Sequence, residues 1–132
     1  MPMSFQDMVA EGRKGTPMVS PKDAQQKMKD DPNTLVVDVR DADGLSEIIP
    51  GAINVSLGTL PLRADKNLPE AMRNAELQDR DRPIITTCGG GGQASLAAKV
   101  LKDMGFTNIS ILDGGTNGWK AAGLPVEAPK KS

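Results

Sequence analysis

The residues of this chain best suited to covalent chemistry are one cysteine and the four glycines that follow it directly. Cys88 is the only cysteine in 132 residues, and the sequence continues as GGGG from 89 to 92. Glycine loses more conformational freedom on folding than any other residue, so four in a row need a structural reason. We therefore expect the backbone at 89–92 to approach another group closely.

This cysteine lies between a predicted strand and a predicted helix. The run PIITT at 83–87 is compact and rich in β-branched residues, and apolar side chains recur at helical spacing over 94–104 until Gly105. A strand, a glycine turn and a helix in this order place Cys88 at the carboxyl end of a strand and against a helix N-terminus. Open α/β sheets bind their ligands at that edge.

The backbone N–H groups of the glycine turn can form an anion-binding ring, because the first N–H groups of a helix have no partner inside it. The expected binding residues are Gly89, Gly90, Gly91, Gly92, Gln93 and Ala94. Such donors favour a thiolate over a thiol, which would make Cys88 a nucleophile. The alternative is that Cys88 is a small buried apolar side chain, the usual role of a lone cysteine.

The same turn also fits a nucleotide-binding pattern. Gly89, Gly91 and Ala94 match the G-x-G-x-x-G/A spacing, and Asp113 lies near the position of a ribose-binding acid. Such a turn normally opens its domain, whereas few residues follow Asp113 in this chain. The late position argues against dinucleotide binding.

The remaining elements indicate one α/β domain. Three further strands are predicted: TLVVDV at 34–39, AINVSL at 52–57 and NISIL at 108–112. They lack alternation, as expected for a parallel sheet covered on both faces. Residues 20–31 form a predicted helix with Ser20 as its N-cap and Pro21 in its first turn.

Two segments are predicted to be less regular. Residues 58–83 contain internal prolines, so we expect short helical pieces and loop there. Near the N-terminus, Ser4 and Asp7 have the spacing of a helix cap, which predicts a short helix. A frayed tail is the alternative for that segment.

Composition excludes several classes of function. The chain has 16 basic and 17 acidic residues and three aromatic ones, so we expect no binding of nucleic acid. It has no histidine, which removes the commonest metal ligand and general base. No stretch approaches the 18 or more apolar residues of a membrane span, and we expect a cytoplasmic protein without membrane contact.

The chain resembles the rhodanese family over about residues 17–127. LVVDVRDADGLSEIIPGAINVSLGTL is similar to the family's strand, its D-V-R turn and its I-P-G-A-I-N-V segment. CGGGGQASLAAKVLKDMGFTNISILDGGTNGWKAAGLPV resembles the family's active-site loop, the helix after it and the closing L-x-G-G-x-x-x-W-x-x-A-G-x-P-V. Two separated segments match in the proper order.

The resemblance implies an α/β fold with an open sheet of about five mostly parallel strands and helices on both faces. It implies a domain at 17–127, with an N-terminal extension at 1–16 and a tail at 128–132. It also implies a sulfurtransferase in which Cys88 takes a sulfane sulfur from thiosulfate or a persulfide, holds it as a cysteine persulfide and passes it to a thiol or cyanide. No cofactor is implied, and we expect a monomer or a weak dimer.

Asp38 and Arg40, in the D-V-R turn, are expected to support the site. Arg40 could raise the positive potential near Cys88, or it could pair with a carboxylate and tie loops together. We favour the second role for Arg40, and for Asp38 we favour loop organisation over acid catalysis.

The loop of this chain departs from the family pattern. Many relatives carry arginine, serine or threonine at the position of Gln93, and many have a basic residue in the loop, whereas this loop is uncharged. Attraction of thiosulfate would then depend on backbone donors and the helix dipole alone, so we expect weak thiosulfate binding.

Two other functions stay open. A cysteine-dependent phosphatase of the same fold would need the signature C-x5-R, and position 94 is alanine. Phosphatases of this fold also have an active-site loop one residue longer than the loop of this chain, which has six residues from Cys88 to Gln93. The other alternative is a module that keeps the fold and binds a protein or senses persulfide without catalysis.

Overall fold

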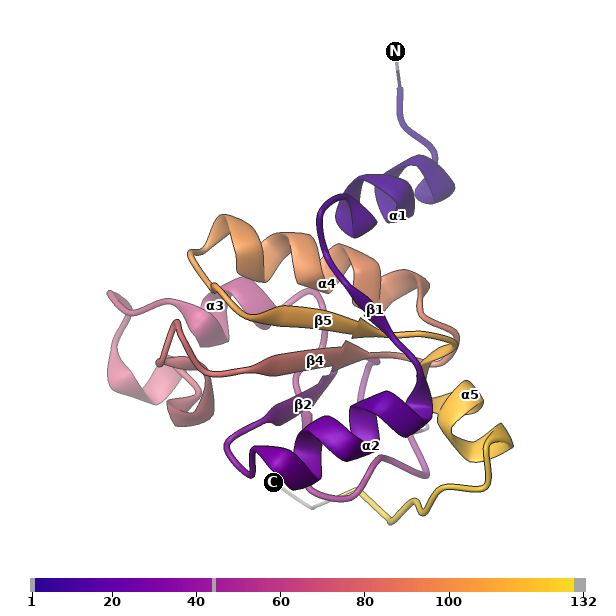
Figure 1. Cartoon of the computed structure of the whole chain (residues 1–132). Helices are drawn as coiled ribbons and strands as arrows, with labels where there is room; N and C mark the ends of the chain where they lie inside the picture. The colour runs from indigo at the N-terminus through magenta and orange to yellow at the C-terminus, as the bar shows by residue number, and fades with distance from the viewer. Residues whose placement is uncertain (1, 44, 130–132) are drawn as a thin grey trace.

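The computed structural model of the chain describes residues 2–43 and 45–129, and its centre is a five-stranded sheet (Figure 1). The order across the sheet is β1-β5-β4-β2-β3, and all four pairings between these strands are parallel. The strands are β1 (Met18–Val19), β2 (Leu35–Asp38), β3 (Ile53–Asn54), β4 (Ile84–Thr87) and β5 (Ile109–Leu112). The predicted fold class is confirmed.

Helices cover both faces of this sheet (Figure 1). They are α1 (Phe5–Arg13), α2 (Pro21–Asp30), α3 (Leu60–Ala64), α4 (Gly92–Asp103) and α5 (Gly115–Ala121), with short 3₁₀ turns at Glu70–Met72 and Ala75–Leu77. Helices α3 and α4 share one apolar core with the sheet, while α2 and α5 share the other.

The two cores explain why the strand sequences lack alternation. Leu35 and Val37 of β2 pack into the core beneath α4, whereas Val36 between them packs into the core beneath α2. Ile84 and Ile85 of β4 divide in the same way. Both faces of each strand are buried, so both need apolar side chains.

The structure also contains elements that the sequence patterns did not predict. Strand β1 has only two residues, too few to show a period, and it pairs with β5 at the edge of the sheet. Helix α5 contains two glycines and an asparagine in seven residues, a composition with low helix propensity. The predicted strand at 52–57 is shorter than expected, because only Ile53–Asn54 joins the sheet.

The segment before the sheet is a helix, not a frayed tail. Ser4 accepts a hydrogen bond from the Asp7 N–H at 3.0 Å, and the Asp7 carboxylate accepts one from the Ser4 N–H at 2.9 Å. This reciprocal capping starts α1, which packs on α4 at the outer side of the fold (Figure 1).

Of the expected tail at 128–132, residues 130–132 lie outside the described residues. Within the described part of the chain, every helix is too short or too polar to cross a membrane.

Candidate active site

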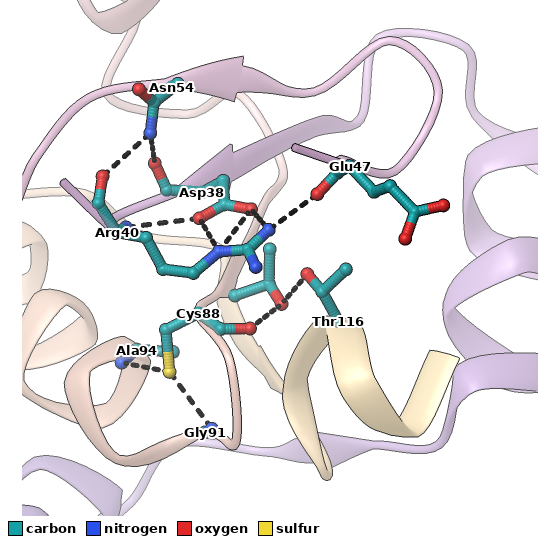
Figure 2. Close-up of polar contacts among 9 residues, drawn as sticks. Asp38, Arg40, Glu47, Asn54, Cys88, Gly91, Ala94 and Thr116 are labelled. Carbon is teal, nitrogen blue, oxygen red and sulfur yellow. Dashed lines mark hydrogen bonds and ion pairs between the residues drawn. The ribbon is translucent and has the colours of Figure 1, made fainter. Parts of the chain in front are cut away.

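Cys88 lies directly after β4 and just before α4. Its Sγ accepts a hydrogen bond from the Gly91 N–H at 3.0 Å and another from the Ala94 N–H at 3.4 Å (Figure 2). Gly91 is the N-cap of α4 and has a φ of 108°, a conformation that favours glycine. The sulfur is therefore held where the N–H groups of a helix start have no partner within the helix.

The six residues of the expected ring divide into two groups. Gly91 and Ala94 donate to the sulfur. The others line, together with Cys88, a pocket of about 410 Å³: Gly89, Gly90, Gly92 and Gln93. Cys88 is almost fully buried, at 4% exposure, and this pocket gives a reactant a route to it.

The loop is oriented by α5, a contact that sequence reasoning missed. The Thr116 N–H donates to the Cys88 carbonyl oxygen at 2.8 Å, and the Asn117 N–H donates to the Gly89 carbonyl at 3.0 Å. The first turn of α5 thus binds the carbonyl groups of the loop, which leaves loop N–H groups free to face the sulfur. The glycine pair at 114–115 was the signal, since both residues have a positive φ at the start of this helix.

Buried hydroxyl groups fasten the end of β4 to the two helices around the loop. The Thr86 hydroxyl donates to the Ala94 carbonyl at 2.9 Å, and the hydroxyl oxygens of Thr87 and Thr116 lie 3.0 Å apart. All three threonines are buried. Because these bonds join β4 to α4 and α5, they fix the position of the loop between them.

Asp38 and Arg40 form a separate, partly buried ion pair beside the loop (Figure 2). Arg40 Nη2 lies 2.7 Å from Asp38 Oδ2 and also donates to the Glu47 carbonyl at 2.8 Å. The Asn54 side chain donates to the main-chain carbonyl groups of Asp38 and Arg40. Asp38 is fully buried, and Arg40 is not among the residues that line the Cys88 pocket. This geometry favours the loop-tying role for both residues.

Helix α1 forms a wall of the pocket that the sequence did not reveal. Its pocket-lining residues are Phe5, Gln6, Val9 and Arg13. The Arg13 Nε–H donates to the Ser95 hydroxyl at 3.0 Å, and that hydroxyl donates to the Gly91 carbonyl at 2.9 Å. The sequence patterns attributed the attraction of thiosulfate to backbone donors and the helix dipole alone, and they gave no indication of Arg13. The loop is uncharged, but a cation from α1 lines the same pocket.

Comparison with known proteins shows which family this chain resembles along most of its length. Residues 20–122 match the rhodanese-like domain. The thiosulfate sulfurtransferase GlpE of Actinobacillus succinogenes is 30% identical over 96 residues, which are 72% of this chain and 77% of that protein. The thiosulfate:glutathione sulfurtransferase of Saccharomyces cerevisiae is 32% identical over 98 residues, 72% of this chain and 70% of the relative.

Solved structures of the same fold carry different descriptions. A Rhodopseudomonas palustris protein of unknown function, described as a possible tyrosine phosphatase, has a TM-score of 0.84 at 28% identity and covers 96% of this chain and 99% of its own. A thiosulfate sulfurtransferase of Pseudomonas aeruginosa has a TM-score of 0.77 at 25% identity. That match covers 96% of this chain but only 23% of the P. aeruginosa protein.

Proposed function

This chain belongs to the rhodanese-like domain family, and from that premise we propose that it is a sulfurtransferase that carries sulfane sulfur on Cys88. Its relatives in A. succinogenes and S. cerevisiae bear sulfurtransferase names, which supports the reaction class. The observation that carries the proposal is the pair of N–H groups, from Gly91 and Ala94, that converge on Cys88 Sγ beside an open pocket.

The first proposed step loads the cysteine. The Cys88 thiolate attacks the outer sulfur of thiosulfate, a new S–S bond forms, and the old S–S bond breaks so that sulfite leaves with its electron pair. Thiolate and dianionic thiosulfate give a persulfide anion and sulfite dianion, so atoms and charge balance. An organic persulfide donor would react in the same way and release its thiolate.

The second proposed step transfers the outer sulfur of the Cys88 persulfide to an acceptor. A thiolate or cyanide ion attacks the terminal sulfur, and Cys88 leaves as a thiolate ready for another cycle. With cyanide the product is thiocyanate. The donor and acceptor are thus the expected partners, either small molecules or other proteins that carry a persulfide or a thiol.

The backbone of the loop would stabilise negative sulfur in both steps. Gly91 and Ala94 donate to the cysteine sulfur itself, while the pocket is lined by other residues of the same loop, among them Gly89, Gly90, Gly92 and Gln93. We propose that the N–H groups of these four bind the terminal sulfur of the persulfide. Donors fixed in advance cost no reorganisation when charge moves onto that sulfur.

Asp38 and Arg40 would act as supporting residues. Their ion pair fixes the turn after β2, and the Asn54 side chain separately ties the main-chain carbonyl groups of both residues to β3. This segment lies beside the Cys88 loop (Figure 2). We assign neither residue a proton-transfer role.

The test is intact mass spectrometry after incubation with thiosulfate and, separately, with a small organic persulfide. We expect wild-type protein to gain one sulfur atom, which cyanide then removes as thiocyanate. Cys88→Ser should gain none. Wild-type protein alkylated beforehand with iodoacetamide is the matched control, because it keeps the fold and lacks only the free thiol.

Assays of the same protein samples distinguish the sulfurtransferase from two other functions. The label of the R. palustris structure favours a test of phosphatase activity, and hydrolysis of an aryl phosphate that depends on Cys88 would support that function instead. The alanine at 94 argues against it, because no arginine follows in the C-x5-R position to bind a phosphoryl group in bidentate fashion. Failure to take up sulfur from any donor would favour a non-catalytic binding or sensing module.

A further inference from the structure

We propose that Arg13, which comes from outside the active-site loop, binds the anionic end of the incoming sulfur donor and so sets the preference of the site for negatively charged reactants. This proposal rests on the sulfurtransferase function proposed above. It assigns to α1 a part of the site that the loop does not provide.

The pocket-facing residues of α1 share one face of the helix. Phe5, Val9 and Arg13 follow one another at intervals of four residues, so their side chains lie above one another on the same side. Phe5 and Val9 pack against the loop. A Cβ placed on Gly92 would lie 2.8 Å from an atom of the Phe5 ring. Arg13 is the charged member of this face and ends it beside the loop.

Contacts with α4 hold helix α1, and with it this face, in a defined position. At Gly12, a Cβ would lie 2.1 Å from the Ser95 carbonyl oxygen, so the two backbones touch there. Just beyond the helix, the Lys102 ammonium donates to the Lys14 carbonyl at 3.0 Å and to the Thr16 hydroxyl at 2.9 Å. The Ser4 and Asp7 cap fixes the first turn of α1 itself, so the helix is formed from its start and is held on α4 near its end. Its side chains are therefore preorganised for binding.

The Arg13 guanidinium has spare hydrogen-bond donors near the loop. Its Nε–H is used by Ser95, which in turn bonds the Gly91 carbonyl. Among the described residues, neither terminal nitrogen has a hydrogen-bond partner, and no carboxylate lies within ion-pair distance of Arg13. Nη2 lies 3.7 Å from the position that a Cβ on Gly91 would take. Four N–H bonds of the guanidinium thus remain for an oxyanion at the pocket.

The arrangement gives a dianionic donor two separate contacts. The outer sulfur of thiosulfate would point toward Cys88 and the N–H groups at the start of α4. Its sulfonate end would point toward Arg13, and the same site would then hold sulfite until it leaves. A guanidinium matches such an oxyanion with two parallel N–H bonds. The competing explanation is that Arg13, as the last residue of α1, only stabilises that helix end through the helix dipole.

Two alkylating reagents distinguish these roles without any sulfur transfer. Iodoacetate and iodoacetamide react alike, since the Cys88 sulfur displaces iodide from the same carbon, but iodoacetate carries a negative charge. Arg13 is exposed, so at low ionic strength we expect Arg13→Gln to lower the ratio of iodoacetate to iodoacetamide rates by about two- to fivefold, as for an exposed ion pair. Arg13→Lys should restore most of the ratio.

Lys14→Gln is the matched control, because it removes the same charge one residue later, where the ammonium pairs with Glu11 at 3.0 Å. It should leave the ratio unchanged. If Arg13 only stabilised α1, its loss would change both alkylation rates together and leave their ratio intact, which would overturn the proposal. Arg13→Met, with a similar apolar stem, repeats the test should the glutamine variant fold poorly.

Steady-state kinetics supply the second readout. The KM for thiosulfate should rise about two- to fivefold in Arg13→Gln with kcat nearly unchanged. An unchanged KM together with an unchanged alkylation ratio would refute the role of Arg13. If wild-type protein transfers no sulfur at all, the proposed function fails, but the alkylation ratio still decides whether Arg13 governs access of anions to Cys88.

Discussion

The main-chain N–H of Thr116 donates to the carbonyl oxygen of Cys88 at 2.8 Å. This bond joins the first turn of α5 to the residue that carries the thiol. It engages the carbonyl oxygen of Cys88, while the N–H groups of Gly91 and Ala94 donate to the sulfur of the same residue (Figure 2). This geometry needs a close approach between the backbones of α5 and the loop.

Gly115 allows α5 to come this close to the loop. Its φ is 62°, and a Cβ there would lie 2.6 Å from the Gly89 carbonyl oxygen and 2.7 Å from that of Cys88. We expect Gly115→Ala to lower the free energy of unfolding by about 1–3 kcal/mol through this collision, beyond the cost of the left-handed backbone. Loading of Cys88 with sulfur should also slow. Urea unfolding and mass spectrometry measure the two effects.

Gly123→Ala is the control for Gly115→Ala. Gly123 has a φ of 81°, but no atom lies within 4 Å of the position that a Cβ would take there, so only the backbone cost of about 1 kcal/mol applies. Equal destabilisation of the two variants would mean that contact with the loop does not limit residue 115.

Gly12 allows α1 to lie directly on α4. Alanine normally stabilises a helix relative to glycine, but here its Cβ would lie 2.1 Å from the Ser95 carbonyl oxygen. We expect Gly12→Ala to displace α1, with a cost of about 1–3 kcal/mol in unfolding free energy and faster alkylation of Cys88 by iodoacetamide. Gly58→Ala, where nothing lies within 4 Å, should change neither quantity appreciably. Slower alkylation in Gly12→Ala would contradict the proposed wall.

The Asp38–Arg40 pair is expected to matter for stability. Arg40→Leu leaves the fully buried Asp38 carboxylate without its partner, which should cost about 3–5 kcal/mol in unfolding free energy. Lys99→Gln breaks an exposed pair with Asp103 and should cost less than about 1 kcal/mol. Should Arg40→Leu keep its stability and instead raise the thiosulfate KM, Arg40 would act on the site through its charge.

The cap of α1 should make that helix sensitive to acid. Hydrogen bonds from the Ser4 backbone and side chain hold the pKa of Asp7 below its ordinary value of 3.8. The cap is therefore fully present above that ordinary value and is lost as the pH falls through the lowered pKa. The protection of the α1 amides against hydrogen exchange, measured relative to the intrinsic exchange rate at each pH, should fall over that acid window.

Asp7→Asn should remove most of this acid dependence, because an amide does not titrate there. Asp23→Asn in the first turn of α2 should leave exchange in α1 as it is in wild-type protein. A loss of α1 protection in acid that persists in Asp7→Asn would assign the effect to another group.

Local signals in the sequence were sufficient for much of the fold. The β-branched run before Cys88, the glycines after it and the helical spacing up to Gly105 each predict an element from neighbouring residues alone. Their order placed the thiol between a strand and a helix, and the structure has β4 and α4 there. The spacing of Ser4 and Asp7 likewise predicted a helix start, and the structure has the complete cap.

The contacts around the thiol were decided by tertiary structure. Periodicity reports which face of an element is apolar, but it does not report which distant segment packs on that face. The position of Arg13 beside Gly91 depends on how α1 lies on α4, and residues far apart in the chain meet there. The same is true of Thr116, whose helix has poor intrinsic propensity and binds the loop carbonyls with its first turn.

The sequence by itself therefore determined that this chain has a thiol between a strand and a helix N-terminus, at the edge of a parallel α/β sheet. Adjacent residues encode the strand, the turn and the helix. Only the tertiary structure decided which groups surround that thiol. Those groups come from α1, α4 and α5, and their meeting depends on close backbone contacts at Gly12 and Gly115 that no local pattern encodes.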